Sequence, residues 1–130
     1  MAKKQNPKFL KEKENFFFFF ETQMLDAYIF ILTTRYLDVI TENLIKQGKA
    51  TFLISGAGHE AVQVATAMAM KPSKDWFYTY YRDDALGLTL GLTVEEIFQH
   101  RLGKATDSFT GGRQMPTHLG SKRLRMPTAS

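Results

Sequence analysis

Residues Trp76–Leu90 read WFYTYYRDDALGLTL, and this stretch predicts a strand that gives way to a helix. Its first half is aromatic and β-prone, whereas its second half has the pattern of a helix. A strand that ends just before a helix is a common place for an α/β protein to present groups to a ligand. At that position stand Tyr81, with a phenol, and Arg82, with a planar fork of N–H donors, a pair suited to phosphate or carboxylate.

The same residues have a plainer interpretation. The aromatic side chains could form a core strand, and Arg82 could pair with Asp83 or Asp84. This stretch alone favours the plainer interpretation, so the neighbouring motifs have to decide.

Upstream, a helical pattern runs from about Glu21 to Gln47, and Gly48 is a good stop signal. Its apolar residues recur three and four positions apart, as on the packing face of an amphipathic helix. They are Leu25, Tyr28, Ile29, Leu32, Tyr36, Val39, Ile40 and Leu44. The opposite side carries Asp26, Thr33, Thr34, Asp38 and Glu42. Because this helix is long for a chain of 130 residues, we expect it to pack against something larger.

The composition of the amino-terminal end predicts two parts of the chain. Residues 1–20 form a basic, phenylalanine-rich extension, and residues 21–130 form the main domain. Residues 1–14 are rich in lysine and contain Pro7, so we expect them to be mobile. The five phenylalanines at Phe16–Phe20 predict the buried or partner-facing start of a helix, because they are too few to span a bilayer.

The middle of the chain holds a glycine-rich turn, Ser55–Gly58, followed by HEAVQVATAMAM, which predicts a buried helix. A lone Gly-Ala-Gly is a weak match to a phosphate-binding loop. Glu60 favours the first turn of that helix, and Thr93–Glu96 is a capping box for another. His100, in the last turn of the second helix, is expected at the surface.

Composition excludes several classes of protein. Cysteine is absent, which rules out disulfides and thiolate catalysis and fits a reducing compartment, so we expect a cytoplasmic location. The net charge of +4 comes largely from the two ends of the chain, where basic residues are most often just solvated. No stretch predicts a membrane span, and the mixed charges of the central residues do not favour nucleic-acid binding.

From Lys104 to Ser130 the pattern is irregular, and glycine and proline are frequent. We expect this segment to be poorly ordered, and a run of this kind is usually functional or mobile. Arg113 and His118 stand out as groups that could face a ligand, although Arg113 could equally be a surface charge and His118 could cap a turn.

Three motifs together, ISGAGHEAVQVA, YYRDDALGLTLGLTVEEIFQHRLGK and GGRQMPTHLGS, resemble a known family. The chain is similar to the α subunit of the thiamine-diphosphate-dependent decarboxylase component of 2-oxo acid dehydrogenases, in its branched-chain (2-oxoisovalerate) form. The resemblance covers about Tyr36 to Ser130 in the family's order and spacing. It implies a thiamine-diphosphate-binding α/β fold, of which this piece should be mostly helical with one or two short strands.

The resemblance also implies a reaction and a set of residues. The cofactor attacks a branched-chain 2-oxo acid or pyruvate, CO₂ leaves, and the acyl group passes to a lipoyl arm. Tyr81 and Arg82 correspond to the residues that bind the diphosphate, with Tyr80 in the same pocket, and Ser130 lies where the backbone approaches the pyrimidine side. Arg113 is implied in substrate or lipoyl contact, and His118 in the active-site channel as the catalytic residue. The implied partners are a β subunit, separate or fused, and a lipoyl-bearing acyltransferase.

One departure from the family pattern concerns the metal. The family holds Mg²⁺ with a GDG motif and a later asparagine, because a hard cation needs such oxygen ligands. This sequence has no GDG and no asparagine after Asn43. We therefore expect an amino-terminal piece of the subunit that holds half of the diphosphate site, without the metal, and that is inactive alone. The alternative is a non-catalytic module that acts by binding a partner chain.

Overall fold

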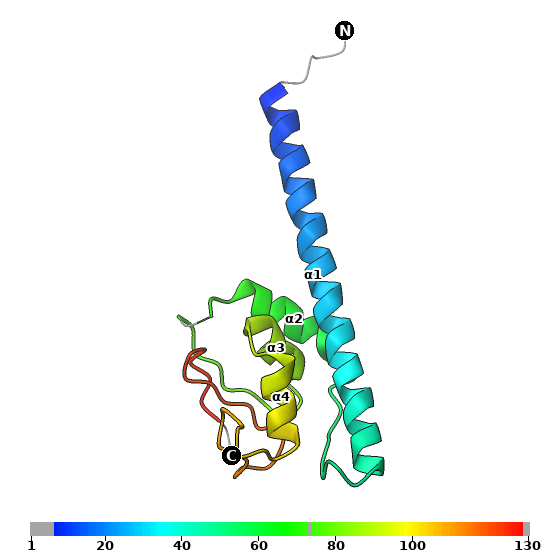
Figure 1. Ribbon diagram of the computed structural model, residues 1–130. Helices are drawn as coiled ribbons and strands as arrows, with labels where there is room; N and C mark the ends of the chain where they lie inside the picture. The colour runs from blue at the N-terminus through cyan, green and yellow to red at the C-terminus, as the bar shows by residue number, and fades with distance from the viewer. Residues whose placement is uncertain (1–6, 73, 129–130) are drawn as a thin grey trace.

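The computed structural model describes residues 7–72 and 74–128, with side chains from Phe20 onward. Four helices occupy these residues: α1 (Pro7–Lys46), α2 (Glu60–Ala69), α3 (Asp84–Leu90) and α4 (Val94–Arg101). Figure 1 shows α1 as a long rod, with the other helices packed beside its carboxyl-terminal half. No helix of the described part is long and apolar enough to cross a membrane.

Helix α1 begins at Pro7, before the helix start predicted at Phe16–Phe20 and the helical pattern from Glu21. Residues 7–14, expected to be mobile, are thus part of the helix. Proline suits a first helical position because its ring already has a helical φ. The helix ends as the sequence predicts: Gly48 has a φ of +71° and donates its N–H to the Ile45 carbonyl at 2.9 Å. Helix α1 passes residue 20 without a break. The division into residues 1–20 and residues 21–130 stays a prediction.

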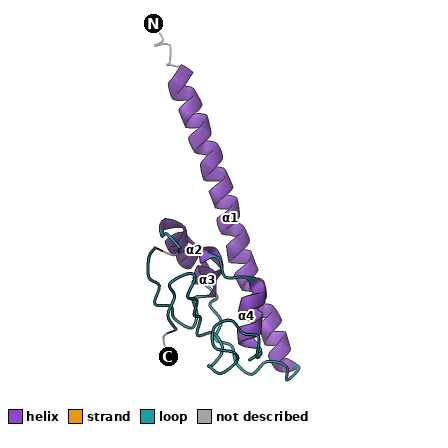
Figure 2. Cartoon of the chain, turned by 60° about the vertical axis from the view of Figure 1, so that its left-hand side comes forward, coloured by secondary structure: helices purple, strands orange, loops and turns teal. Residues whose placement is uncertain are grey.

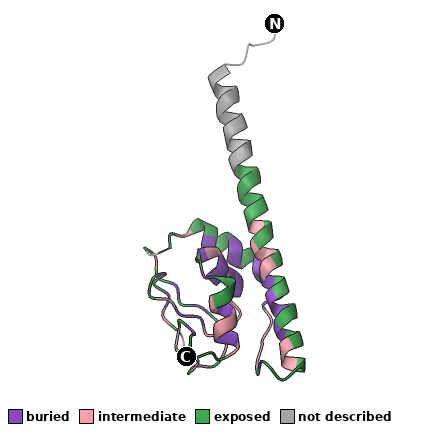
Figure 3. Cartoon of the chain, viewed as in Figure 1, coloured by how far each residue is buried: buried purple, intermediate pink, exposed green. Residues whose placement is uncertain are grey.

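The face that α1 presents to the rest of the chain is mixed: Leu37, 2% exposed, belongs to the core, and polar residues are buried beside it. Thr34, Asp38 and Thr41 are 1%, 3% and 0% exposed. The apolar side is largely exposed, as the green stretches of α1 in Figure 3 show, at Leu25, Tyr28, Ile29, Leu32, Tyr36, Val39 and Ile40. The expected orientation is therefore wrong. A buried polar face is tolerated here because its groups are partnered, as when the Thr41 hydroxyl donates to the Leu37 carbonyl at 2.7 Å.

The predicted strand at the start of Trp76–Leu90 is absent from the described structure. Residues 76–80 have no regular structure, and their backbone link to residue 125 is one hydrogen bond, from the Phe77 N–H to the Arg125 carbonyl at 3.1 Å. The β-pairing in the described residues is the isolated bridge between Ser121 and Met126. Figure 2 shows these segments as loops. A β-prone sequence becomes a strand only where a neighbouring strand completes a ladder, and none lies beside it here.

The carboxyl-terminal segment belongs to the core. Leu119, Leu124 and Met126 are 1%, 5% and 2% exposed and pack with the apolar residues of the helices. The expectation of a poorly ordered segment from Lys104 onward is wrong as far as Thr128. A segment without regular structure is ordered here because its apolar side chains fill the space beside α3 and α4.

The local signals for the short helices are confirmed in part. At α4, Thr93 Oγ1 accepts the Glu96 N–H at 3.1 Å, and the Glu96 carboxylate accepts the Thr93 N–H at 2.8 Å, so the capping box forms as predicted. Helix α2 is buried on one side only, since Val64 is 1% exposed and Val62 is 63% exposed. The prediction of a buried helix therefore holds for one side of α2 only. Phe20, at the end of the phenylalanine run, is 52% exposed, and the other four lie outside the described side chains.

Candidate functional site

Arg101 is the buried centre of the helical packing. Its guanidinium donates to the Asp38 carboxylate at 2.8 Å and to the Asp84 carboxylate at 2.5 Å. It also donates to the Leu37 carbonyl at 2.9 Å and to the Thr41 hydroxyl at 2.5 Å. One side chain of α4 therefore fixes both α1 and the first residue of α3.

The electrostatics of this group favour a charged arginine. Burial alone would lower the pKa of Arg101, but the attraction of Asp84 and Asp38 outweighs it and raises the pKa. Burial raises the pKa of Asp84, and Arg101 offsets only part of that effect. The site depends on the guanidinium, because without it two carboxylates would lie buried and unpaired.

The two aspartates that follow Arg82 have separate structural tasks. The Asp83 carboxylate accepts the Tyr80 N–H at 2.7 Å, and the Asp83 N–H donates to the Tyr80 carbonyl at 3.0 Å, which closes a tight turn before α3. Asp84 is held by Arg101. Neither pairs with Arg82, so that part of the plainer interpretation is wrong.

At this turn the side chains of Tyr80, Tyr81 and Arg82 come together beside His118, and we call these four residues the Tyr–Arg cluster. Arg82 Nη1 donates to the Tyr80 hydroxyl at 3.0 Å, and the Tyr80 hydroxyl donates to that of Tyr81. The Arg82 guanidinium carbon lies 4.8 Å from the centre of the Tyr81 ring. The Tyr81 and His118 ring centres are 6.2 Å apart.

The chemistry of the cluster fits a diphosphate. Arg82 is partly exposed, and among the described residues its side chain hydrogen-bonds to Tyr80 and pairs with no carboxylate. The hydrogen bond to the Tyr81 hydroxyl raises the pKa of Tyr80. Because Tyr80 donates its proton to Tyr81, the Tyr81 hydroxyl is left to donate to a ligand. A positive fork with phenol donors beside it can accept an anion by charge-assisted hydrogen bonds.

The Ser55–Gly58 turn is not a second anion site. The Gly56 N–H donates to Asp38 at 3.0 Å, the Ala57 N–H to the Ser55 hydroxyl at 3.1 Å, and the Gly58 N–H to Glu60 at 2.7 Å. These donors are already used inside the protein. The weak resemblance to a phosphate loop therefore has no counterpart in the structure.

Asp107, which the sequence did not single out, organises the segment after α4. Its carboxylate accepts N–H groups from Phe109, Thr110 and Gly112 at 3.1, 3.1 and 3.2 Å. It also contacts His100 Nδ1 at 3.2 Å, and both side chains are 0% exposed. The expectation that His100 lies at the surface is wrong, because a carboxylate from the next loop covers it.

The remaining predicted site residues are placed differently. His118 Nδ1 lies 3.1 Å from the Met115 carbonyl, and its ring faces Tyr81. Arg113 is exposed, its Nε donates to the Thr110 carbonyl at 2.9 Å, and no described contact joins it to the cluster. Ser130 lies outside the described residues. The structure thus brings four of the six predicted residues together.

Asp107 gives the protein a testable dependence on pH. Burial would raise the pKa of Asp107, but the hydrogen bonds from Phe109, Gly112, His100 and Thr110 outweigh it and lower the pKa below its usual 3.8. The unfolded chain therefore takes up this proton first, and the stabilisation is lost as pH falls through the folded pKa. We expect Asp107→Asn to flatten the decline in the free energy of unfolding between about pH 5 and 3.

The measurement is urea unfolding followed by circular dichroism across that range. Asp107→Asn should also lose roughly 1–3 kcal/mol at pH 7, because an amide cannot accept all these donors. Asp26→Asn, at an exposed position on α1, is the matched control and should keep the wild-type slope. An unchanged slope in Asp107→Asn would contradict the assignment.

A family comparison accounts for the motifs around the cluster. The model of the dehydrogenase E1 component family matches residues 29–130. The chain belongs to the dehydrogenase E1 component family. The α subunit of the 2-oxoisovalerate dehydrogenase of Bacillus subtilis is 37% identical over 110 residues, which are 85% of this chain and 33% of that protein. The mitochondrial α subunit of Dictyostelium discoideum is 30% identical over 132 residues, 97% of this chain and 26% of that protein.

Two facts limit what the E1 component family implies for this chain. The chain spans about a quarter to a third of the length of these relatives. Within the described residues, no three His, Asp or Glu side chains gather in a way that could hold a metal ion.

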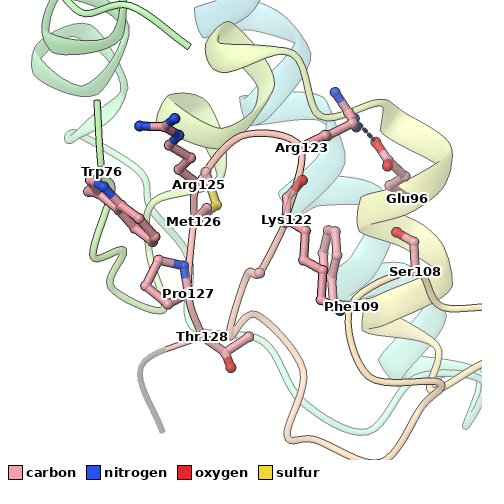
Figure 4. A pocket seen from close by; sticks show the side chains of 12 residues that line it. Trp76, Glu96, Ser108, Phe109, Lys122, Arg123, Arg125, Met126, Pro127 and Thr128 are labelled. Atoms are coloured by element: carbon pink, nitrogen blue, oxygen red, sulfur yellow. Dashed lines mark hydrogen bonds and ion pairs between the residues drawn. The ribbon is translucent and has the colours of Figure 1, made fainter. Parts of the chain in front are cut away.

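A hollow lined by residues of α4 and of the carboxyl-terminal segment lies away from the Tyr–Arg cluster. It has a volume of about 870 Å³. Figure 4 shows Arg125 beside Trp76 on one side of it and the Arg123–Glu96 pair on the other. Arg123 donates to Glu96 at 2.7 Å, and Arg125 donates to the Lys74 carbonyl at 2.9 Å. Glu96 neutralises Arg123, and Arg125 is occupied by a main-chain carbonyl, whereas Arg82 lies beside phenols that can themselves donate to an anion, so the cluster makes the better anion site.

Proposed function

We propose that this chain is part of the α subunit of a thiamine-diphosphate-dependent 2-oxo acid dehydrogenase, and that Tyr81 and Arg82 bind the diphosphate, with Tyr80 beside them. The observation that carries the proposal is the meeting of these three side chains at one turn, with a guanidinium that no acidic group of the described residues neutralises. Membership of the E1 component family supports it.

Each residue of the cluster would have a separate task. When bound, thiamine diphosphate supplies the electron sink for decarboxylation. Arg82 would grip the diphosphate oxygens with its fork, and Tyr81 would orient them through its hydroxyl. In the His118 tautomer whose Nδ1–H donates to the Met115 carbonyl, Nε2 is left to hold or move a proton next to the cluster. Arg113, farther along the same loop, would contact the substrate or the lipoyl group, and Ser130 the pyrimidine side.

The rest of the site would come from elsewhere. The helices would pack on a doubly wound α/β domain, with residues 21–130 as part of it and residues 1–20 as an extension. Mg²⁺ would be held by residues of the complete subunit. The substrate would be a branched-chain 2-oxo acid or pyruvate, and the partners a β subunit and a lipoyl-bearing acyltransferase.

The exposed apolar side of α1 favours a second candidate, in which the chain acts by binding a partner and not by catalysis. Ile29, Leu32, Tyr36 and Ile40 line a groove of about 400 Å³ together with Val94 and Phe98 of α4. A patch of this kind on a protein surface marks an interaction site. The two candidates differ in whether the cluster binds anions.

The proposal predicts that the chain binds inorganic pyrophosphate and thiamine diphosphate with similar dissociation constants, on the order of 1 mM, because its charge-assisted contacts are all made to the diphosphate end. Thiamine without phosphates should not bind. Isothermal calorimetry with and without Mg²⁺ measures all three ligands. Micromolar affinity for thiamine diphosphate would contradict the half-site interpretation, and no heat with either diphosphate would contradict the proposed function.

A further inference from the structure

Two residues hold the main chain of Arg82, one on α2 and one in the glycine-rich turn before it. Gln63, 7% exposed on α2, donates its side-chain N–H to the Arg82 carbonyl at 3.0 Å. Gly56 lies against the same carbonyl, because a Cβ added there would be 2.8 Å from the Arg82 oxygen. Real Cβ atoms essentially never come this close to another heavy atom, so only glycine fits at this position.

Gly56 cannot move away to make room. Its N–H donates to the Asp38 carboxylate at 3.0 Å, and its carbonyl accepts the His59 N–H at 2.9 Å. The Ser55 hydroxyl donates to the same Asp38 oxygen at 2.7 Å. Asp38 is fixed in turn by Arg101. A side chain at position 56 would therefore push the Arg82 carbonyl away, because the Ser55–Gly58 turn is itself held in place.

The position of Arg82 is also fixed from the other side. Asp84, two residues later, is anchored to Arg101, and the Tyr80–Asp83 turn precedes it. The main chain of Arg82 is thus fixed on both sides, so its side chain starts from a defined position from which it can reach a ligand. Binding groups gain from such preorganisation, because no free energy is then spent in ordering them.

We propose that Gly56 and Gln63 are positioning residues for Arg82: they set the place and direction of its guanidinium by contact with its carbonyl. This inference rests on the proposed function, since it concerns the same anion site. It explains a glycine-rich turn whose own N–H donors are bound to other groups of the protein. Gly56 serves close approach of two backbone segments, and Gln63 joins them.

The test compares Gly56→Ala with a matched glycine variant. The added methyl group of Gly56→Ala should displace the Arg82 carbonyl by roughly half an ångström, enough to lose the contact distance of a charge-assisted hydrogen bond. We expect pyrophosphate to bind about tenfold more weakly, measured by NMR titration at a temperature where the protein is folded. Gln63→Met removes the hydrogen bond without adding a clash and should weaken binding about threefold by the same relation.

Gly48→Ala is the control. Gly48 has a φ of +71°, and a Cβ there meets nothing within 4 Å, so the variant is strained without touching Arg82. It should lose stability and keep the wild-type affinity for pyrophosphate. Weaker binding of pyrophosphate by Gly56→Ala would then be explained by displacement of Arg82 and not by a general loss of stability.

Each outcome separates this inference from the proposed function. Wild-type binding with tenfold loss in Gly56→Ala and none in Gly48→Ala supports it. Equal binding by wild type and Gly56→Ala overturns it and leaves the proposed function standing, as does an equal loss in both glycine variants. Absence of binding by the wild type overturns both. If Gly56→Ala does not fold, Gln63→Met decides, and unchanged affinity in that variant overturns the inference.

Discussion

Arg101→Met is expected to lower the free energy of unfolding by about 3–5 kcal/mol, the cost of removing one partner from a buried ion pair. The substitution keeps most of the apolar length of the side chain and deletes the guanidinium. Asp38 and Asp84, which are 3% and 2% exposed, would then lie buried with no cation between them. Because small domains have a net stability of about 5–15 kcal/mol, the variant would be close to unfolding. Urea unfolding at pH 7, followed by circular dichroism, measures the loss.

A surface arginine of the same chain is the control for this experiment. Arg123 pairs with Glu96, but its side chain is 50% exposed, so Arg123→Met should cost less than about 1 kcal/mol. Adding Asp38→Asn and Asp84→Asn to Arg101→Met should restore part of the stability, because the buried charges are gone. A loss below 1 kcal/mol in Arg101→Met, or no recovery in the triple variant, would show that the carboxylates do not depend on the guanidinium.

Arg82→Ala is expected to abolish most of the anion binding of the Tyr–Arg cluster. A hydrogen bond to a charged group contributes about 1.5–3 kcal/mol, which corresponds to a roughly 10- to 100-fold weaker dissociation constant for pyrophosphate. Arg82→Lys should recover little, because an ammonium group cannot present the planar fork. Tyr81→Phe removes one phenol and should cost about tenfold. NMR titration of each variant with pyrophosphate gives the three values.

Arg125→Ala serves as the matched charge control. Arg125 lies over Trp76, 5.8 Å from its ring centre, and lines the hollow of about 870 Å³, which no residue of the cluster lines. Its loss changes the net charge of the protein as Arg82→Ala does and should leave the affinity for pyrophosphate within twofold. Comparable losses in both variants would mean that the protein attracts anions by net charge alone.

The sequence predicted those features of the fold that depend only on residues close together in the chain. The capping box of α4 joins residues three apart, and the stop at Gly48 depends on one glycine, so both could be read from local spacing. The orientation of α1 could not be predicted from local spacing. Its exposed side looks like a core face, and the deciding partner, Arg101, lies 63 residues from Asp38. A charged residue near a helix end gives no sign of burial until the fold brings two carboxylates to it.

The same limit applies to the candidate site. Tyr80, Tyr81 and Arg82 are consecutive, so their meeting at one turn follows from the sequence almost directly. That His118 joins them and Arg113 does not depends on the course of the loop that Asp107 ties together. The strand predicted before the turn failed to form because strand pairing needs a second segment, which local sequence does not show.

The assignment of the Tyr–Arg cluster as an anion site is tested most directly by mapping backbone amide shifts while the 130-residue chain is titrated with pyrophosphate. We predict saturable shifts at Tyr80–Asp84 and at Gly56, with a dissociation constant on the order of 1 mM. Shifts confined to Lys122–Arg125, or none that saturate, would contradict the account.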